Sequence, residues 1–568
     1  MKYLKFGYII LAIGVISSCS KRFDNLLTDP SIPTTDAADV DAFLNQAQIS
    51  FSGFYTAASD FGGALARQQS LTGGSLYENA YSPQSFDGIW STAYTGIVKH
   101  VDALIPLAEA QKKYQQEGIG KLLKAYAMAT LVDDFGDIPY SEADQGVGNI
   151  NPKADAGQDV YTQVLALIDE AITSLNQPQD TKTKTKTDLF YNGDNAKWIL
   201  FGNTLKLKLL MQERLVKDVT ADVTALETDN NLIYTSSDDF QFFYGKNIAS
   251  PDTRHLHYVN NYLGGGANDY ISNDFMFRML AKKSGGIVSS LDPRRRYYFY
   301  RQVGDYSKAD NTTCPCLNQP RPSWYPDDMP FCLPDLALDG SGIGYWGRDH
   351  GDASGVGPDN LFRTSWGLYP AGGQFDESLF TALSSTGLGA GGKGIDPIWL
   401  SSYTYFLQAE AALTLDVTVN GDARSLLESG IRASISKVLG FPAQIGFAIT
   451  SDTNFNRNTP YKIDTYVNTV LANYDAAASD DERLNIVMEE YSIALWGNGV
   501  EPYNNLRRTG KPYGLQFMVT TANPGFFIRS FFYPAVFVDN NNNAPAQHTP
   551  GLGVQKVFWD NNPDDFIK

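Results

Sequence analysis

The chain has little of the chemistry on which most catalytic and metal sites depend. Among its 568 residues are four cysteines and five histidines, and no His/Glu cluster has the spacing of a zinc site. The nucleophile pattern Gly-x-Ser-x-Gly and the phosphate-loop pattern are also absent. Acidic residues outnumber basic ones, 63 to 45, which argues against nucleic acid, because lysine and arginine must neutralise its phosphates. We therefore expect a protein that is not an enzyme, with no cofactor or metal and no nucleic-acid partner.

Long apolar runs are also lacking, since crossing a bilayer takes about 20 apolar residues. The apolar run at the start, Phe6–Ile16, follows two lysines and ends just before Ser17-Ser18-Cys19. This pattern predicts a lipoprotein signal peptide over 1–18, removed before Cys19, and a tether over 19–37. Several acyl chains on Cys19 would anchor the mature protein stably to a membrane. An ordinary signal peptide with a chance cysteine is the alternative.

The other three cysteines lie in one Pro-rich segment, at Cys314, Cys316 and Cys332. Outside the cytoplasm such cysteines form disulfides by default. A bridge within Cys-Pro-Cys would be strained, so we expect Cys332 to pair with Cys314 or with Cys316. A metal site with His350 as the fourth ligand is the alternative.

Helical periodicity divides the chain into three parts. Apolar residues recur at the 3.6-residue spacing of a helix within 38–233 and again within 396–568, which ends in loops rich in Asn, Pro and aromatics. The pattern is largely lost over 234–395. Helices that cannot bury their apolar faces alone are typical of stacked helix pairs. The expected helices are 41–59, 90–115, 120–135, 158–175, 195–216, 396–415, 423–439 and 479–496.

Four segments carry a resemblance to a known family. They are Phe135–Tyr140 (FGDIPY), Ala196–Leu207 (AKWILFGNTLKL), Tyr405–Ala411 (YFLQAEA) and Asn485–Gly510, which ends a helix in Gly-Asn-Gly-Val-Glu and leads into Arg-Arg-Thr-Gly. Taken in this order, they resemble the signature of SusD/RagB-type nutrient-binding outer-membrane lipoproteins, which implies that Arg-Arg-Thr-Gly is a loop. Together with the lipoprotein start, the resemblance covers nearly the whole mature chain.

The resemblance implies a mostly α fold, in which tetratricopeptide-like helix pairs carry a variable, irregular ligand-binding region at 234–395. It also implies capture of an oligosaccharide or a peptide at the outer membrane, on the cell surface. The implied partner is a SusC-like TonB-dependent transporter, on which the protein would act as a lid. A surface-anchored hydrolase or a structural surface protein without a transport role is the alternative. The sequence does not choose between glycan and peptide.

Aromatic residues in the middle region are the candidates for ligand binding. A pyranose ring can stack on an indole, while its hydroxyls need planar polar partners, and loop side chains are less often committed to a core. Trp198, Trp399 and Trp496 stand in helical patterns and are expected in the core. The candidate binding residues are Trp324, Tyr325, Tyr345, Trp346, Arg348, Asp349, Trp366 and Tyr369, with Tyr77 and Tyr81 as weaker candidates.

Other charged pairs receive a structural interpretation. His255 and His257 have no third ligand at a metal spacing, so two loop histidines are expected. Adjacent acids such as Asp327-Asp328 and Glu489-Glu490 rarely flank a glycosidic bond at the distance that hydrolysis needs. Arg507-Arg508 could bind an anion, but a structural ion-pair role is favoured.

Overall fold

The structure is a computed structural model of the chain. Cys19 and Tyr77, two of the candidate residues, lie outside the residues that it describes. The described residues are 39–71, 81–180, 183–262, 269–282, 292–303, 314–333, 345–352, 362–383, 387–449, 460–520, 527–548 and 555–564.

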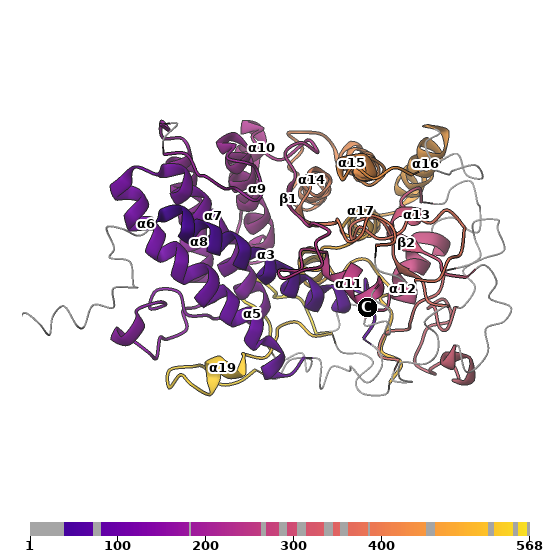
Figure 1. Ribbon diagram of the computed structural model, residues 1–568. Coiled ribbons are helices and arrows are strands. Elements are labelled where there is room, and N and C mark those ends of the chain that lie inside the picture. Colours follow the sequence, from indigo (N-terminus) through magenta and orange to yellow (C-terminus); the bar gives the residue numbers. More distant parts are fainter. Residues whose placement is uncertain are drawn as a thin grey trace, which may run out of the picture.

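The first part of the chain forms a block of antiparallel helices at one end of the molecule (Figure 1). Within it α7 packs against α6 and α8, and α8 packs against α9. The long helix α3 lies against α6 and α7. The elements are α3 (Val40–Leu65), η2 (Pro83–Phe86), α5 (Asp87–Ser91), η3 (Thr92–Val98), α6 (Lys99–Gln111), α7 (Tyr114–Phe135), η4 (Gly146–Gly148), α8 (Gly157–Leu175), α9 (Asn195–Glu213) and α10 (Thr220–Asp229).

Local sequence explains where the central helices of this block begin and end. The side chain of Asp194 accepts from the N–H groups of Ala196 and Lys197 and so caps the start of α9. Helix α7 ends at Phe135, because Gly136 follows with φ +83°, a conformation that glycine adopts readily. Most of α7 is buried around its circumference, as expected of a helix between neighbours.

The second helical block follows the middle region and packs with α9 and α3 of the first. Two expectations are wrong here. Residues 396–399 belong to a strand, and α14 begins only at Ser401; Arg507-Arg508-Thr509 lies within helix α18, not in a loop. The elements are α14 (Ser401–Leu415), α15 (Ala423–Gln444), α16 (Pro460–Ala476), α17 (Asp480–Ala494), α18 (Val500–Thr509) and α19 (Ala535–Val538).

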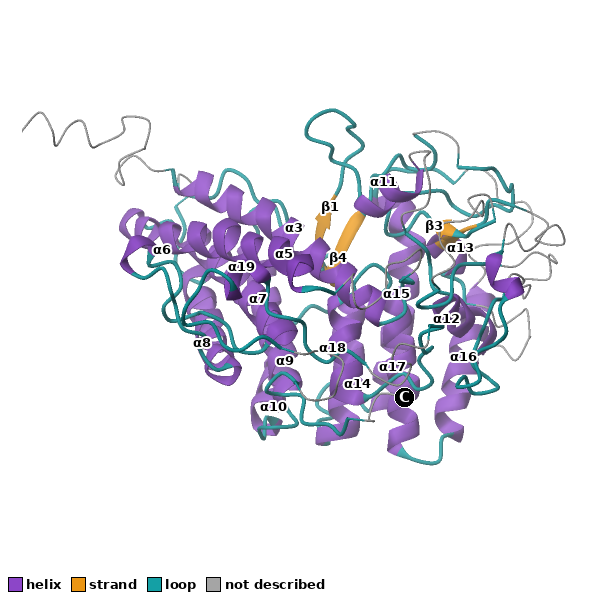
Figure 2. Ribbon diagram, turned by 90° about the horizontal axis from the view of Figure 1, so that it is seen from below, coloured by secondary structure: helices purple, strands orange, loops and turns teal. Residues whose placement is uncertain are grey.

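The chain enters the middle region along strand β1 (Phe240–Phe243) and returns from it along strand β4 (Ile395–Trp399). These two strands pair in one two-stranded antiparallel sheet, visible in Figure 2. In it Phe240 lies opposite Trp399. Between these strands the described residues form short elements separated by loops. They are α11 (Leu256–Tyr262), α12 (Asn273–Phe277), η5 (Arg278–Lys282), α13 (Arg295–Tyr298), β2 (Phe299–Tyr300), η8 (Pro315–Asn318) and β3 (Ser365–Trp366).

The predicted fold class, mostly helical, is confirmed by these elements. None of the helices in the described ranges combines the length and the apolar character that crossing a membrane demands.

A buried polar junction on α18 joins the two helical blocks. Arg508 donates from Nε and Nη2 to the two carboxylate oxygens of Glu410 in α14, both at 2.7 Å. Arg214 lies 3.1 Å from the same carboxylate. Two turns earlier on the same face of α18, Glu501 lies 2.8 Å from Lys208 of α9, and both side chains are 2% exposed. The predicted structural role of Arg508 agrees with this geometry.

Removing Arg508 should therefore destabilise the protein strongly. Arg508→Ala leaves Glu410 buried with Arg214 as its remaining cation, and we expect the free energy of unfolding to fall by about 3–5 kcal/mol. Urea denaturation would measure it. Arg424→Ala is the matched control, because Arg424 also holds Asp475 with two bonds, at 2.7 and 2.9 Å, but on the surface. Its loss should stay within about 1 kcal/mol. Equal losses in the two variants would contradict the role of the junction.

Candidate functional site

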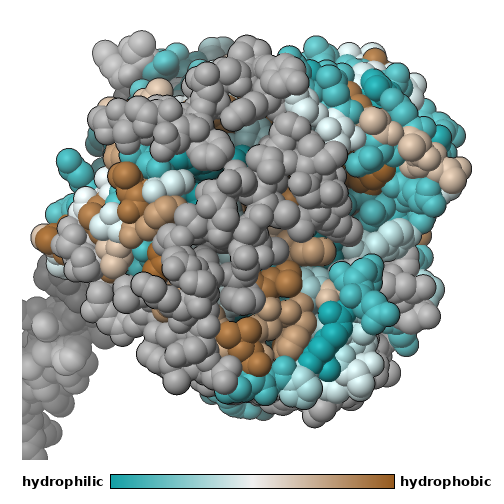
Figure 3. All heavy atoms as spheres, turned by 90° about the vertical axis from the view of Figure 1, so that its right-hand side faces the viewer, coloured by the Kyte–Doolittle hydropathy of each residue, from teal (hydrophilic) through white to brown (hydrophobic). Residues whose placement is uncertain are grey.

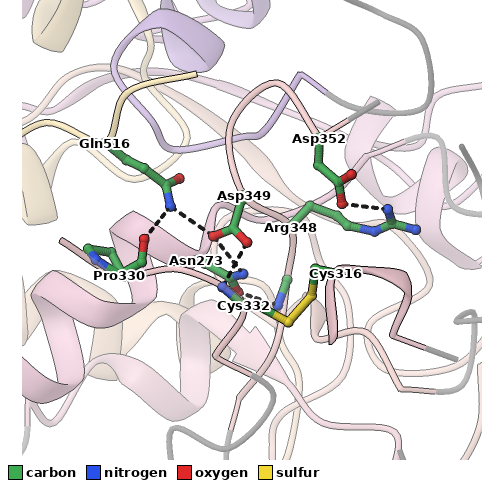
Figure 4. Close-up of a disulfide and its surroundings, with 9 residues drawn as sticks. Asn273, Cys316, Pro330, Cys332, Arg348, Asp349, Asp352 and Gln516 are labelled. Carbon is green, nitrogen blue, oxygen red and sulfur yellow. Dashed lines mark hydrogen bonds and ion pairs between the residues drawn. A yellow bond between two sulfur atoms is a disulfide. The ribbon is translucent and has the colours of Figure 1, made fainter. Parts of the chain in front are cut away.

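Segments of the middle region meet the C-terminal loop around one buried carboxylate (Figure 4). Asp349 accepts from the backbone N–H of Cys332 at 2.8 Å, from Nε2 of Gln516 at 2.8 Å and from Nδ2 of Asn273 at 3.2 Å. Burial raises the pKa of Asp349 to about 6, although these three hydrogen bonds act in the opposite direction. Asp349 thus serves as an internal anchor for three chain segments, with its carboxylate turned away from solvent.

A disulfide closes the loop that carries Trp324. Cys316 is bonded to Cys332, one of the two pairings that the sequence left open. Cys314 lies outside this bridge and is buried beside Trp346. Among the described residues, no group of three or more His, Cys, Asp or Glu side chains could hold a metal ion.

The expected stacking surface on Trp346 and Trp366 is wrong in this structure, because both side chains are fully buried. Trp366 lies between His257, at 3.8 Å between ring centroids, and Trp496, at 4.1 Å. Trp346 packs with Cys314 and Cys316. Trp366 belongs to a hydrophobic core that the middle region shares with α15 and α17, and Trp346 belongs to a smaller cluster beside the disulfide, so neither indole faces a ligand.

The neighbouring candidates are also buried, and they are bonded to other residues of the protein. Tyr345 hydrogen-bonds Asp376 at 3.2 Å, and Arg348 lies 2.9 Å from Asp352. Tyr369 and Tyr81 are likewise buried, and the Tyr81 hydroxyl donates to the carbonyl of Phe61 at 2.7 Å. Because they are buried, the expected direct contact with a ligand is not supported for these candidates: Tyr345, Arg348, Asp349, Tyr369 and Tyr81.

Among the candidates that the structure describes, Trp324 is the one whose ring remains partly accessible. It is half-buried, and its indole N–H donates to the carbonyl of Met518 at 3.2 Å. The adjacent Tyr325 is buried, and its hydroxyl donates to the carbonyl of Phe517. The C-terminal loop thus fixes both rings.

At the end of the molecule that carries α12, α13 and α16, apolar patches lie among hydrophilic side chains (Figure 3).

The two histidines form a buried ionic cluster between the helical block and the middle region. Nδ1 of His257 lies 2.8 Å from Asp269, and its Nε2 lies 3.3 Å from Asp60 of α3. Despite burial, these two carboxylates raise the pKa of His257 to about 10, so it carries a charge at neutral pH. Burial lowers the pKa of His255, 3.6 Å from Asp396, well below its usual value. The cluster is structural, and the sequence pattern, which indicates two loop histidines, does not predict that they are buried among carboxylates.

Asp396 should make stability depend on pH. Burial raises its pKa to about 7, while the hydroxyls of Tyr244 and Thr56 donate to it at 2.8 and 3.0 Å. The folded protein then keeps this proton to a higher pH than the unfolded chain, whose pKa is about 3.9, so stability is lost as pH rises from about 4 to 7. Asp396→Asn should remove that loss, at most about 1.4 kcal/mol per pH unit.

Urea denaturation across this pH range would test the effect. The exposed variant Asp327→Asn should keep the pH profile of the parent. An unchanged profile in Asp396→Asn would show that Asp396 is ionised throughout the range.

The acidic pairs hold no catalytic arrangement. Glu490 is buried and accepts from the hydroxyl of Tyr466 at 2.8 Å, and it lies 3.2 Å from Arg294. Asp327 and Asp328 are exposed on the loop beside Trp324. A glycosidase needs two carboxyl groups facing each other across a bond, and neither pair is placed in that way.

Sequence reasoning missed a cleft of about 650 Å³ at the outer end of the β1–β4 sheet. The loop between β1 and α11, which projects from the helices in Figure 2, forms one wall. A Gly-rich stretch before β4 forms the second, and the turn after α15 forms the third. The glycine run was the signal that could have revealed it. The lining residues are Gly245, Lys246, Ile248, Arg254, Gly387, Gly389, Ala390, Gly391, Lys393, Ile445, Gly446 and Phe447.

Family comparisons match the chain along two stretches. Residues 33–313 match a family described as "Starch-binding associating with outer membrane", and residues 390–554 match "Susd and RagB outer membrane lipoprotein". The chain belongs to the SusD/RagB family of outer-membrane lipoproteins. No curated protein matches the sequence.

Solved structures of SusD homologues share the fold over nearly their whole length. A SusD homologue from Bacteroides fragilis is 17% identical, with a TM-score of 0.64 over 92% of this chain and 99% of that one. A chitin-binding protein is 20% identical, with a TM-score of 0.64 over 92% and 100%. A chitin-binding SusD homologue from Flavobacterium johnsoniae is also 20% identical, with a TM-score of 0.58 over the same shares.

Proposed function

We propose that the protein captures an oligomeric nutrient at the outer membrane and delivers it, without catalysis, to a SusC-like TonB-dependent transporter, on which it acts as a lid. The family match over 33–313 and 390–554 carries this proposal. The arrangement of the chain supports it, since a helical scaffold presents a large, loop-rich region that enters and leaves through one small sheet. Glu490, which is buried in an ion pair with Arg294, and Asp327 and Asp328, which are exposed side by side, do not flank a bond as hydrolysis requires, and this favours binding.

An oligosaccharide is the ligand class that we favour over a peptide. Two of the structural neighbours are described as chitin-binding. Trp324 offers an indole whose N–H is fixed by a backbone carbonyl, so that its orientation is set before a sugar arrives. Fixing a contact residue in advance lowers the entropy cost of binding.

Trp324→Ala should weaken binding of the true oligosaccharide about fivefold to a hundredfold, because it removes an aromatic contact worth about 1–3 kcal/mol. Calorimetry with the detergent-solubilised protein against a glycan and peptide panel would measure it, with thermal melts to check folding. Tyr114→Ala on α7 is the control, as a half-buried aromatic on the opposite block. Unchanged affinity in Trp324→Ala would remove Trp324 from the binding site.

The alternative functions make a different prediction for partners. A hydrolase or a structural surface protein needs no transporter, whereas the proposed lid should copurify with a TonB-dependent receptor from detergent-extracted outer membranes. A neighbouring gene for such a receptor would support the same conclusion. Hydrolysis of the bound oligomer by the purified protein would favour the alternative.

The anchor has its own test. Lipidation of Cys19 should hold the mature protein on the outer membrane, exposed at the cell surface. Cys19→Ala should therefore move it from the membrane fraction to the soluble fraction, because the acyl chains supply the membrane affinity. Cys314→Ala is the matched control and should stay with the membrane. Persistence of Cys19→Ala in detergent-extractable membranes would contradict lipid anchoring.

A further inference from the structure

We propose that the cleft at the outer end of the β1–β4 sheet is a second binding site, which takes a carboxylated unit of an oligosaccharide. The inference rests on the proposed nutrient-binding function and adds a subsite and a chemical class to it. The cleft volume, about 650 Å³, lies within the range of about 300–1,000 Å³ that small-molecule sites occupy.

The walls of the cleft are held in place by their own hydrogen bonds. In the β1–α11 loop, Gly245 N–H donates to the carbonyl of Thr253 at 2.8 Å, and Thr253 N–H donates to that of Asn247 at 3.0 Å. This loop is tied to the Gly-rich wall where His255 N–H donates to the carbonyl of Gly392 at 3.0 Å. The cavity is therefore formed before a ligand binds.

Glycine is required in the second wall. Gly389 has φ +62°, and a Cβ there would stand 2.0 Å from the carbonyl oxygen of Gly373. Gly391, at φ +65°, lies against the first wall, because a Cβ on it would stand 3.7 Å from the Cβ of Lys246. Left-handed backbone at both positions lets this wall pass close to its neighbours and leaves space beside Lys246.

The charge of the cleft is opposite to that of the protein. Its lining includes Lys246, Arg254 and Lys393 and no acidic residue, in a chain with net charge −18. Asp252 neutralises Arg254 through two bonds, at 2.9 and 2.6 Å. For Lys246 and Lys393, the described part of the chain provides no ion-pair partner. The Nζ of Lys393 donates to the carbonyl of Ile445 at 2.7 Å, which holds one ammonium group at the rim.

The backbone of the cleft favours a sugar over a peptide. Peptides are commonly captured by main-chain hydrogen bonds along an extended strand. Here the N–H groups of Gly391, Lys393 and Phe447 already donate to carbonyls within the protein, at 3.2, 3.3 and 2.8 Å. Recognition is then left to the two ammonium groups and to the apolar surface of Ile248, which is 68% exposed. A carboxylate on a ring with apolar C–H faces fits that combination.

Calorimetry with the detergent-solubilised full chain would test the site. The probes are oligogalacturonate, oligoalginate, a methyl-esterified oligogalacturonate and an oligoglutamate peptide of similar length. We expect one of the two acidic oligosaccharides to bind, with an affinity that falls as salt rises. The esterified form, which has lost its charge, should bind at least about tenfold more weakly, because a hydrogen bond to a charged group is lost.

Lysine variants assign the binding to this cleft. Lys246→Gln and Lys393→Gln should each weaken it about tenfold, since glutamine keeps a polar group but no charge. Lys246→Arg should restore most of the affinity, and Lys99→Gln, at an exposed lysine on α6, should change nothing.

Several results would overturn the proposal. They are binding of neither acidic oligosaccharide, equal binding of the esterified form, insensitivity to both lysine variants, or preferential binding of oligoglutamate. Failure of the protein to copurify with a TonB-dependent transporter would instead count against the general nutrient-binding function, so the two failures are distinguishable.

Discussion

The architecture depends on charges that are buried and must be paired. Helix α18 carries Arg508, which bonds to Glu410 of α14, and Arg507, which donates to the backbone carbonyl of Asp133 at the end of α7. Moving a charge out of water is costly unless its partner is well placed, so the two helical blocks are stable only in a register that satisfies both arginines. An Arg-Arg pair in a hydrophilic segment is therefore part of the buried core.

Sequence periodicity predicted the long helices and missed the elements that depend on partners elsewhere in the chain. Residues 195–213 are apolar around most of the helix, and their pattern alone identifies α9. The strand β4 could not be recognised in the same way, because Ile395–Trp399 is buried throughout and its partner, β1, lies about 150 residues earlier in the chain. Short strands are defined by pairing, which a single local pattern does not contain.

The sequence predicted a loop-rich middle region and did not predict the surroundings of most of its aromatic residues. Gly/Pro-rich loops indicated a loop-built region, but no local pattern indicated that Trp366 would be buried between His257 and Trp496. A tryptophan buries more area than other side chains, so a large insertion without long helices has a strong reason to place its indoles inside. A loop aromatic stays partly exposed where the surrounding chain holds its ring in place, as the C-terminal loop holds Trp324.

The net charge of the protein and the charge of the cleft have opposite signs and act over different distances. A net charge of −18 keeps the protein away from nucleic acid and anionic lipid surfaces, and it would also repel an acidic nutrient at long range. Salt screens that repulsion beyond about 8 Å at physiological ionic strength, whereas an ammonium group in direct contact with a carboxylate is screened much less. Lys246 and Lys393 could thus select an acidic unit at short range within an acidic protein. The long-range repulsion then slows the encounter with an acidic ligand, while the affinity is set by the contacts inside the cleft.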